Sequence, residues 1–150
     1  MKQKSKILPP TYFYMLLIFL IIFHFIFPVL LFIKPPLSYL GFIPIILGIL
    51  INILTDNLFK KNGTTVKPYE KPSKLIIEGP FRISRHPMYL GMLFILIGIA
   101  ILLGSILTIT FPIIFFLIME IIFIPHEEET MEKYFNTEYN SYKKKVRRWI

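Results

Sequence analysis

Long stretches without a charged residue alternate with polar stretches along this chain of 150 residues. Residues 11–33 and 37–55 contain no Asp, Glu, Lys or Arg, and neither does the longer stretch 88–119. One crossing of a bilayer takes roughly 20 apolar residues, so the longest stretch has room for two crossings. We therefore predict four transmembrane helices, at about 11–33, 37–55, 87–103 and 105–124, the last two joined by a tight turn near Gly104.

The polar stretches predict a central loop over residues 56–86 and a tail over residues 125–150. Gly63, Pro68 and Pro72 interrupt any helix in the loop, whereas Pro87 suits the first turn of the third span. The tail carries apolar residues at helical spacing, which are Met131, Phe135, Tyr139, Tyr142 and Val146. This stripe predicts an amphipathic helix that lies on the bilayer or caps the bundle. The expected fold is a single all-α domain over residues 1–150, an integral membrane bundle of about four transmembrane helices with an amphipathic C-terminal cytoplasmic helix.

Charge orients the predicted bundle in the membrane. The chain is 55% hydrophobic, yet it has seventeen Lys and Arg against nine Asp and Glu, a net charge of +8. With four spans, sixteen of the seventeen basic residues fall on one side, and only Lys34 falls on the other. The positive-inside rule predicts that both termini and the central loop are cytoplasmic. The first apolar stretch is too long for a signal peptide and lacks a cleavage site, so we expect it to remain as a span. We expect the cytoplasmic membrane of a prokaryote rather than an endoplasmic reticulum.

Two clusters of charged residues flank the predicted hairpin of the third and fourth spans. Arg82, Arg85 and His86 precede it, and Glu127 and Glu128 follow it. Because both ends of a hairpin emerge on the same side, we expect the two clusters to meet at the cytoplasmic rim. Each cluster alone is also typical of interfacial anchors or of a solvated helix end.

Other polar residues leave alternatives open. Glu120 lies about one turn inside the fourth span and almost two turns before Glu127, so it faces a cavity or partner, or else reaches up to the interface. His24 is interpreted as a hydrogen-bonded packing residue. The chain has no cysteine, which excludes disulfides and thiolate chemistry, and its three histidines are scattered, so no metal site is expected.

The second half of the chain resembles a known family. The stretches that carry the resemblance are GPFRISRHPMYLG and, after the hydrophobic hairpin, EETMEKYFNTEYNSYKKKVRRW. They resemble the isoprenylcysteine carboxyl methyltransferase family and the related phospholipid methyltransferases, over roughly residues 75–150. Met131 stands where Leu is usual, and Asn136 stands where Gly is usual. Because Asn also tolerates a left-handed backbone, the turn at Asn136 is expected to be kept.

The resemblance implies S-adenosylmethionine as the methyl donor and a lipophilic acceptor that enters from the bilayer, with membrane lipids as partners and no nucleic acid. It implies that the donor is bound by His86, Tyr89, Glu127 and Glu128. Arg85 and Arg148 are the candidate catalytic groups, as cations that would position an acceptor carboxylate.

The acceptor stays open at this point. The carboxylate of an isoprenylated cysteine is the first choice, and it needs no base because it is already ionised. A phospholipid amine must lose a proton, for which His86 or a carboxylate would have to be the acceptor. Small-molecule methylation and a membrane anchor without catalysis are further alternatives, whereas a transport pathway would need more polar residues in the spans.

Overall fold

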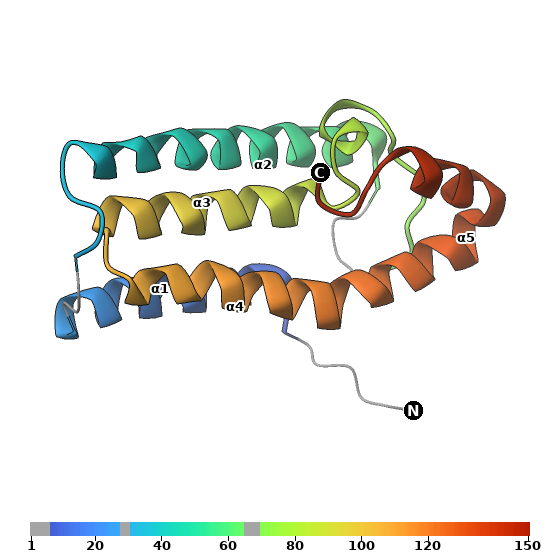
Figure 1. Cartoon of the computed structure of the whole chain (residues 1–150). Helices are drawn as coiled ribbons and strands as arrows, with labels where there is room; N and C mark the ends of the chain where they lie inside the picture. The colour runs from blue at the N-terminus through green and yellow to red at the C-terminus, as the bar shows by residue number, and fades with distance from the viewer. Residues whose placement is uncertain (1–6, 28–30, 65–69) are drawn as a thin grey trace.

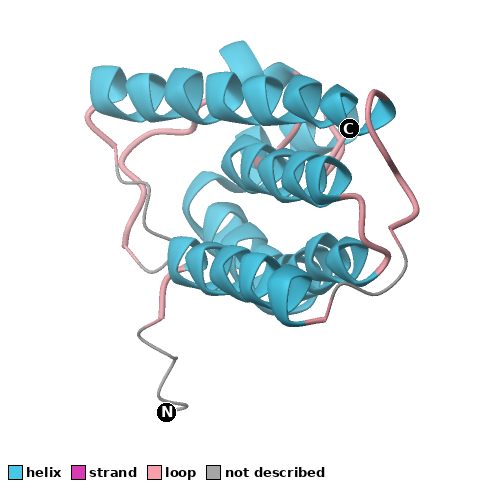
Figure 2. Ribbon diagram, turned by 90° about the vertical axis from the view of Figure 1, so that its left-hand side faces the viewer, coloured by secondary structure: helices cyan, strands magenta, loops and turns pink. Residues whose placement is uncertain are grey.

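Helices make up nearly all of the ordered structure in the computed structural model, which describes residues 7–27, 31–64 and 70–150. Five α-helices follow one another in these ranges: α1 (Pro9–Ile26), α2 (Phe42–Asn62), α3 (Pro87–Leu103), α4 (Thr110–Ile118) and α5 (Ile124–Lys145). Shorter 3₁₀ turns cover Leu37–Gly41, Gly79–Arg82 and Leu107–Ile109, and a π-helical turn, Met119–Phe123, connects α4 to α5. The view in Figure 2 shows helices joined by loops, without a strand in the described part. The prediction of an all-α fold is confirmed.

The helices have the length and surface of membrane-spanning segments. Three are long and apolar enough to cross a bilayer, namely Pro9–Ile26, Leu37–Asn62 and Leu107–Lys145, and Pro87–Leu103 is a shorter apolar helix. Large apolar side chains point outward along α1 and α2, among them Phe25, Ile46 and Ile53. In water such a surface would be unfavourable, but lipid tails solvate it. The chain is an integral membrane protein.

The main core lies between α1, α3 and α4, which run alongside one another in Figure 1. Leu20 of α1, Leu96 of α3 and Phe115 of α4 are all fully buried there. The core continues through the π-helical turn into α5, where Phe123 and Ile124 are also buried. This packing fixes the end of the α3–α4 hairpin from which the polar cluster projects.

Helix α2 packs along α3 through glycines rather than large side chains. A Cβ atom built on Gly48 of α2 would lie 2.4 Å from the carbonyl oxygen of Gly91 in α3, and one on Gly41 would lie 2.3 Å from that of Gly98. No side chain fits at these points, so the two backbones are in direct contact. Close approach at small residues is the usual way in which membrane helices associate without a hydrophobic driving force.

The two ends of α3 follow local signals in the sequence. Pro87 is the first residue of the helix, where its missing N–H costs no hydrogen bond. At the other end Gly104 adopts a left-handed conformation (φ 66°) and its N–H donates to the carbonyl of Ala100. The carbonyl of Gly104 in turn accepts hydrogen bonds from the N–H groups of Phe32 and Ile33, which ties the turn to the segment after α1.

Several helix boundaries differ from the predicted spans. Helix α1 ends at Ile26, and Leu31 to Ile33 lie outside it, because the segment 31–33 pairs with the Gly104–Ser105 turn instead. Helix α2 continues past residue 55 to Asn62, where Gly63 terminates it in a left-handed conformation (φ 58°). The predicted loop therefore begins about two turns later than expected.

The helix does not end at the predicted boundary between the fourth span and the tail. Pro125 lies in the first turn of α5, which follows the π-helical turn directly, so the helical path continues through it. The path bends at Asn136, whose backbone is not helical (φ 18°, ψ −97°). A turn is thus present where it was expected, but its ψ is not that of a left-handed helical residue. Beyond it Tyr139 and Tyr142 pack on Ile76 and Phe81.

Candidate functional site

The site begins with the segment 84–86, just before α3, which is held by backbone contacts to the end of the chain. The N–H of Arg85 donates to the carbonyl of Arg147 (3.0 Å). The fully buried hydroxyl of Ser84 donates to the carbonyl of Arg148 (2.8 Å) and accepts from the N–H of His86 (3.1 Å). Figure 1 accordingly shows the C-terminus beside the start of α3. These bonds join two segments that lie about sixty residues apart in sequence.

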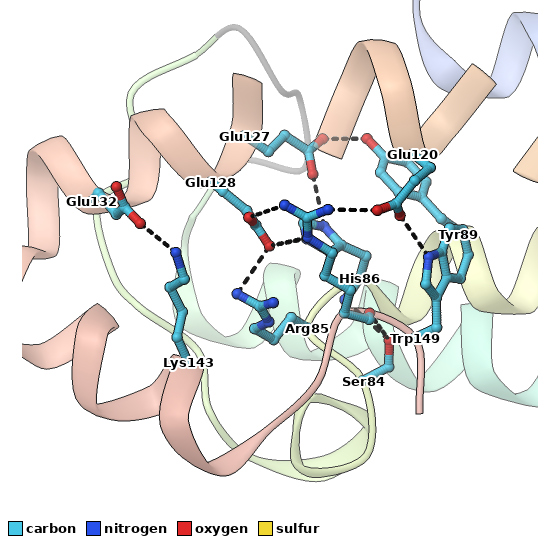
Figure 3. A network of polar contacts seen from close by, with 11 residues as sticks. Ser84, Arg85, His86, Tyr89, Glu120, Glu127, Glu128, Glu132, Lys143 and Trp149 are labelled. Carbon is cyan, nitrogen blue, oxygen red and sulfur yellow. Dashed lines mark hydrogen bonds and ion pairs between the residues drawn. The ribbon is translucent and has the colours of Figure 1, made fainter. Parts of the chain in front are cut away.

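Glu127, in the first turn of α5, contacts two aromatic rings of the α3 start. One of its oxygens lies 3.1 Å from Nδ1 of His86, and the other accepts a hydrogen bond from the hydroxyl of Tyr89. The rings of His86 and Tyr89 are parallel, with centroids 5.8 Å apart. Figure 3 shows both rings pointing toward the Glu127 carboxylate. The carboxylate therefore fixes the position of both rings.

Glu128 is the centre of a buried ionic cluster. Its carboxylate accepts a two-pronged contact from Arg148, with Nε at 3.1 Å and Nη2 at 2.9 Å. Arg85 approaches the same carboxylate to 2.9 Å and Nε2 of His86 approaches it to 3.6 Å. Only 5% of Glu128 is exposed, so these cations replace the water that a carboxylate otherwise needs.

The ionic surroundings change the acidity of both partners. Burial alone would raise the pKa of Glu128, but the hydrogen bonds from His86 and Arg148 and the charges of the two arginines lower it to about 2. Burial would lower the pKa of His86, but its contacts with Glu127 and Glu128 outweigh burial and raise it above 6.5. At neutral pH the cluster accordingly holds an ionised Glu128, and the two carboxylates stabilise the protonated form of His86 relative to an imidazole in water.

Arg148 also extends the cluster toward the membrane-spanning part of the chain. Its Nη1 donates to Glu120 in the π-helical turn, and the indole N–H of Trp149 donates to the other oxygen of Glu120 (2.8 Å). The ring of Trp149 packs on Phe116 of α4, with centroids 4.9 Å apart. In Figure 3 dashed lines join Glu120 to the indole of Trp149 on one side and to the ionic cluster around Glu128 on the other. Of the alternatives for Glu120, this geometry corresponds to a carboxylate that faces a partner.

A cavity of about 110 Å³ adjoins the cluster. Arg85, His86, Tyr89 and Glu127 line one part of it. Apolar side chains such as Ile76, Phe81 and Met131 also line it, together with polar ones from the loop after α2 and from α5. Nε of Arg85 is buried beside this cavity without a hydrogen-bond partner within the described residues. In the same ranges no three His, Cys, Asp or Glu side chains are arranged to hold a metal ion.

Two tyrosines beyond the bend in α5, Tyr139 and Tyr142, line the cavity as well. Tyr142 donates to the carbonyl of Phe81 (2.6 Å), which fixes the second half of α5 over the Gly79–Arg82 turn. Tyr139 is nearly buried beside Arg85, and burial raises its pKa to about 12, so its hydroxyl stays protonated. The bend at Asn136 is thus what turns the end of α5 back toward the site.

All six candidate site residues lie in this one network, which combines the start of α3, the start of α5 and the end of the chain. They are Arg85, His86, Tyr89, Glu127, Glu128 and Arg148. Sequence reasoning missed Ser84 and Trp149. Ser84 acts through two hydrogen bonds to distant backbone groups, for which the sequence has no local signal. The sequence offered two weak indications of Trp149: it is the one tryptophan of the chain, and it follows the candidate residue Arg148.

Fold and site together define an integral membrane protein with a buried ionic cluster and a cavity at one end of its helical bundle. A family model described as phospholipid methyltransferase matches residues 37–138. The chain belongs to the phospholipid methyltransferase family, and the resemblance stated from the motifs is confirmed.

Individual relatives extend this comparison. The chain is 33% identical over 114 residues to a probable protein-S-isoprenylcysteine O-methyltransferase of Oryza sativa subsp. indica, a match that covers 73% of the chain and 58% of the relative. An uncharacterized protein of Haemophilus influenzae is 43% identical over 63 residues, 42% of the chain and 100% of that protein. The chain therefore spans little more than half the length of the rice relative.

A solved structure shares the fold. It is that of the eukaryotic intramembrane Ras methyltransferase, an isoprenylcysteine carboxyl methyltransferase, with a TM-score of 0.70 and 26% sequence identity. The match covers 93% of this chain and 50% of the other. Nearly all of the chain thus has a structural counterpart in about half of a larger methyltransferase.

Proposed function

We propose that this protein transfers a methyl group from S-adenosylmethionine to a lipophilic acceptor in the membrane, with the carboxylate of an isoprenylated cysteine as the first choice. The observation that carries the proposal is the convergence of His86, Tyr89 and Glu127 on a cavity that Arg85 also lines. Membership of the family supports methyl transfer, and the names of the relatives support this acceptor. A cavity lined by both polar and apolar groups, at one end of an apolar bundle, suits a water-soluble donor that must meet a membrane-dissolved acceptor.

The residues at the cavity fit such a donor in chemical type. S-adenosylmethionine would supply an electrophilic methyl group on a sulfonium. Glu127 borders the cavity and offers carboxylate oxygens to hydroxyl donors, and the buried Nε of Arg85 offers an unused donor to a carboxylate. The parallel rings of His86 and Tyr89 supply a flat wall, and Tyr89 suits a cationic group.

Glu127 and Glu128 have different surroundings, which favours different roles in donor binding. Glu127 borders the cavity, whereas Glu128 is almost fully buried and is occupied by Arg85 and Arg148. We therefore assign the direct contact to Glu127. Glu128 would contribute by fixing the two arginines, since removing one partner of a buried ion pair costs about 3–5 kcal/mol.

The arginines are proposed to orient the acceptor. Arg148 is 38% exposed at its side chain and contacts Glu120 in the α4–α5 path, on the side nearest the spans. Arg85 is only 9% exposed and borders the cavity. A lipophilic carboxylate arriving from the bilayer would therefore meet Arg148 first. In-line transfer needs alignment and exclusion of water more than it needs acid or base catalysis.

The acidity of the cluster favours a carboxylate acceptor over an amine. An amine must lose a proton to the protein, but both ring nitrogens of His86 face carboxylates, which stabilise the protonated ring, and in that form it cannot accept the proton. The pKa of Glu128, lowered to about 2, makes that carboxylate a weak base as well. A phospholipid amine remains the alternative, since the family model carries that name, and a carboxylate that borders the cavity, such as Glu127, would then have to accept the proton.

The proposed orientation has four spans, with both termini and the loop after α2 on the cytoplasmic side. The shorter helix α3 completes the count, and the cytoplasmic side would hold sixteen of the seventeen basic residues. The part of α5 beyond Asn136 would lie as an amphipathic helix at the membrane surface, with Lys144 exposed and Tyr142 buried.

A transfer assay with two acceptors tests the proposal. Purified protein in lipid nanodiscs is incubated with methyl-labelled S-adenosylmethionine and either N-acetyl-S-farnesylcysteine or phosphatidylethanolamine. We expect label in the base-labile ester of the farnesylcysteine, and a fall of about 100-fold in Arg148→Ala, in which the acceptor is misaligned. Label in the phospholipid alone would identify the phospholipid amine, and not the isoprenylcysteine carboxylate, as the acceptor. Label in neither compound would contradict the proposal.

A further inference from the structure

Glu120 is a carboxylate of the apolar α4–α5 path that the proposed reaction does not use directly. It lies in the π-helical turn Met119–Phe123, and its two oxygens accept from Nη1 of Arg148 and from the indole N–H of Trp149. Arg148 is thereby held between two carboxylates, Glu120 through Nη1 and Glu128 through Nε and Nη2. All three donor nitrogens of the guanidinium are bound, so its plane has a defined orientation.

The π-helical turn accounts for this arrangement. In a regular α-helix two residues eight positions apart, such as Glu120 and Glu128, lie about 80° apart around the axis. A π-helical turn contains one residue more than an α-helical turn, so the rotation between Glu120 and Glu128 is smaller by about 100°. The two carboxylates then lie about 20° apart around the axis. Both therefore face the same side of the α4–α5 path and reach one arginine. In a regular helix Glu120 would align with Glu127 instead.

Trp149 completes the contact from the other direction. Its indole donates to Glu120 and packs on Phe116, while the backbone on either side of Arg148 is bound to the segment before α3. The carbonyl of Arg147 accepts from Arg85 and that of Arg148 accepts from Ser84. The side chain and the backbone of Arg148 are thus held by different partners. Glu120 is the group that holds Nη1 of the guanidinium.

We infer that Glu120 is a positioning residue for methyl transfer, which acts through Arg148 and Trp149 to hold the guanidinium where an acceptor carboxylate arrives. The inference rests on the proposed function and adds a residue that the family motif does not contain. Glu120 itself is not proposed to touch the donor or the acceptor. Its loss should change the use of the acceptor and leave donor binding intact.

The test compares Glu120→Gln with Glu129→Gln, which makes the same chemical change at the exposed glutamate that follows Glu128. We expect Glu120→Gln to lower kcat/KM for N-acetyl-S-farnesylcysteine by about tenfold or more, with KM for S-adenosylmethionine unchanged. Glu129→Gln should behave as the wild type. Because Trp149 is the only tryptophan, its emission spectrum reports the contact, and it should shift in Glu120→Gln but not in the control.

A double-mutant cycle separates positioning from a merely structural role. If Glu120 acts through Arg148, then adding Glu120→Gln to Arg148→Gln should cost little more than Arg148→Gln alone. Glu120→Asp keeps the charge and serves as a second variant if Glu120→Gln does not fold, with an expected intermediate activity. If the losses of activity in the two single variants add in the double variant, or if folded Glu120→Gln has wild-type kinetics, this inference is overturned and the proposed function still stands. Absence of transfer by the wild-type protein would instead overturn the proposed function, and with it this role of Glu120.

Discussion

The imidazole of His86 joins the two carboxylates of the site, and its charge state sets the stability of the cluster. Nδ1 lies 3.1 Å from Glu127 and Nε2 lies 3.6 Å from Glu128, in a position that is almost fully buried. These contacts stabilise the protonated ring, which is why the pKa of His86 is raised. A raised pKa in the folded state means that folding is favoured by protonation of this residue.

The stability of the protein should therefore depend on pH through His86. The contribution of His86 to stability should be complete below about pH 6.5, the value for the unfolded chain, and should be lost as the pH rises through the higher folded value. We expect the melting temperature of the wild-type protein in detergent to fall across this range. His86→Gln should start from a lower melting temperature and lack that particular fall. An equal fall in both proteins would assign it to other groups.

At the scale of elements, the contact between α2 and α3 depends on glycine. A side chain at Gly48 has no room, since even a Cβ atom would lie 2.4 Å from a backbone oxygen of α3. Gly48→Leu should therefore push the helices apart and destabilise the protein by roughly 1–3 kcal/mol or more. Thermal unfolding in detergent measures the change, with Ile46→Leu, at an exposed position of the same helix, as a control near zero. A wild-type melting temperature for Gly48→Leu would contradict the direct backbone contact.

Elements with local signals could be predicted from the sequence, and those determined by distant contacts could not. Pro87 and Gly104 mark the ends of α3 because each imposes its own backbone geometry. The motif residues around His86 and Glu127 could be assigned to one site because a hairpin returns its ends to the same side. In contrast, the bonds of Ser84 and Arg85 to the end of the chain join distant backbone groups that any residue type possesses. The π-helical turn that aligns Glu120 with Glu128 likewise had no signal in the hydrophobic pattern.

At the scale of the whole molecule, the proposed orientation can be tested directly because the chain has no cysteine. Single cysteines introduced at exposed positions, Leu37→Cys near one end of the bundle and Ser73→Cys and Asn140→Cys near the other, are treated with a membrane-impermeant maleimide. We expect labelling of Leu37→Cys in intact cells, and labelling of the other two only in inside-out vesicles. Labelling of Ser73→Cys and Asn140→Cys from opposite sides would contradict the four-span arrangement.

The cavity beside His86 and Glu127 is proposed to bind a methyl donor. Calorimetric titration of S-adenosylmethionine, and of its demethylated product, into the detergent-purified protein supplied with farnesylcysteine or membrane lipids measures this binding. We expect binding by the wild type and by Glu129→Ala, and its loss in folded Glu127→Ala and His86→Ala, which remove groups that border the cavity. No binding by the folded wild-type protein, with acceptors present, would rule out a donor site in this cavity.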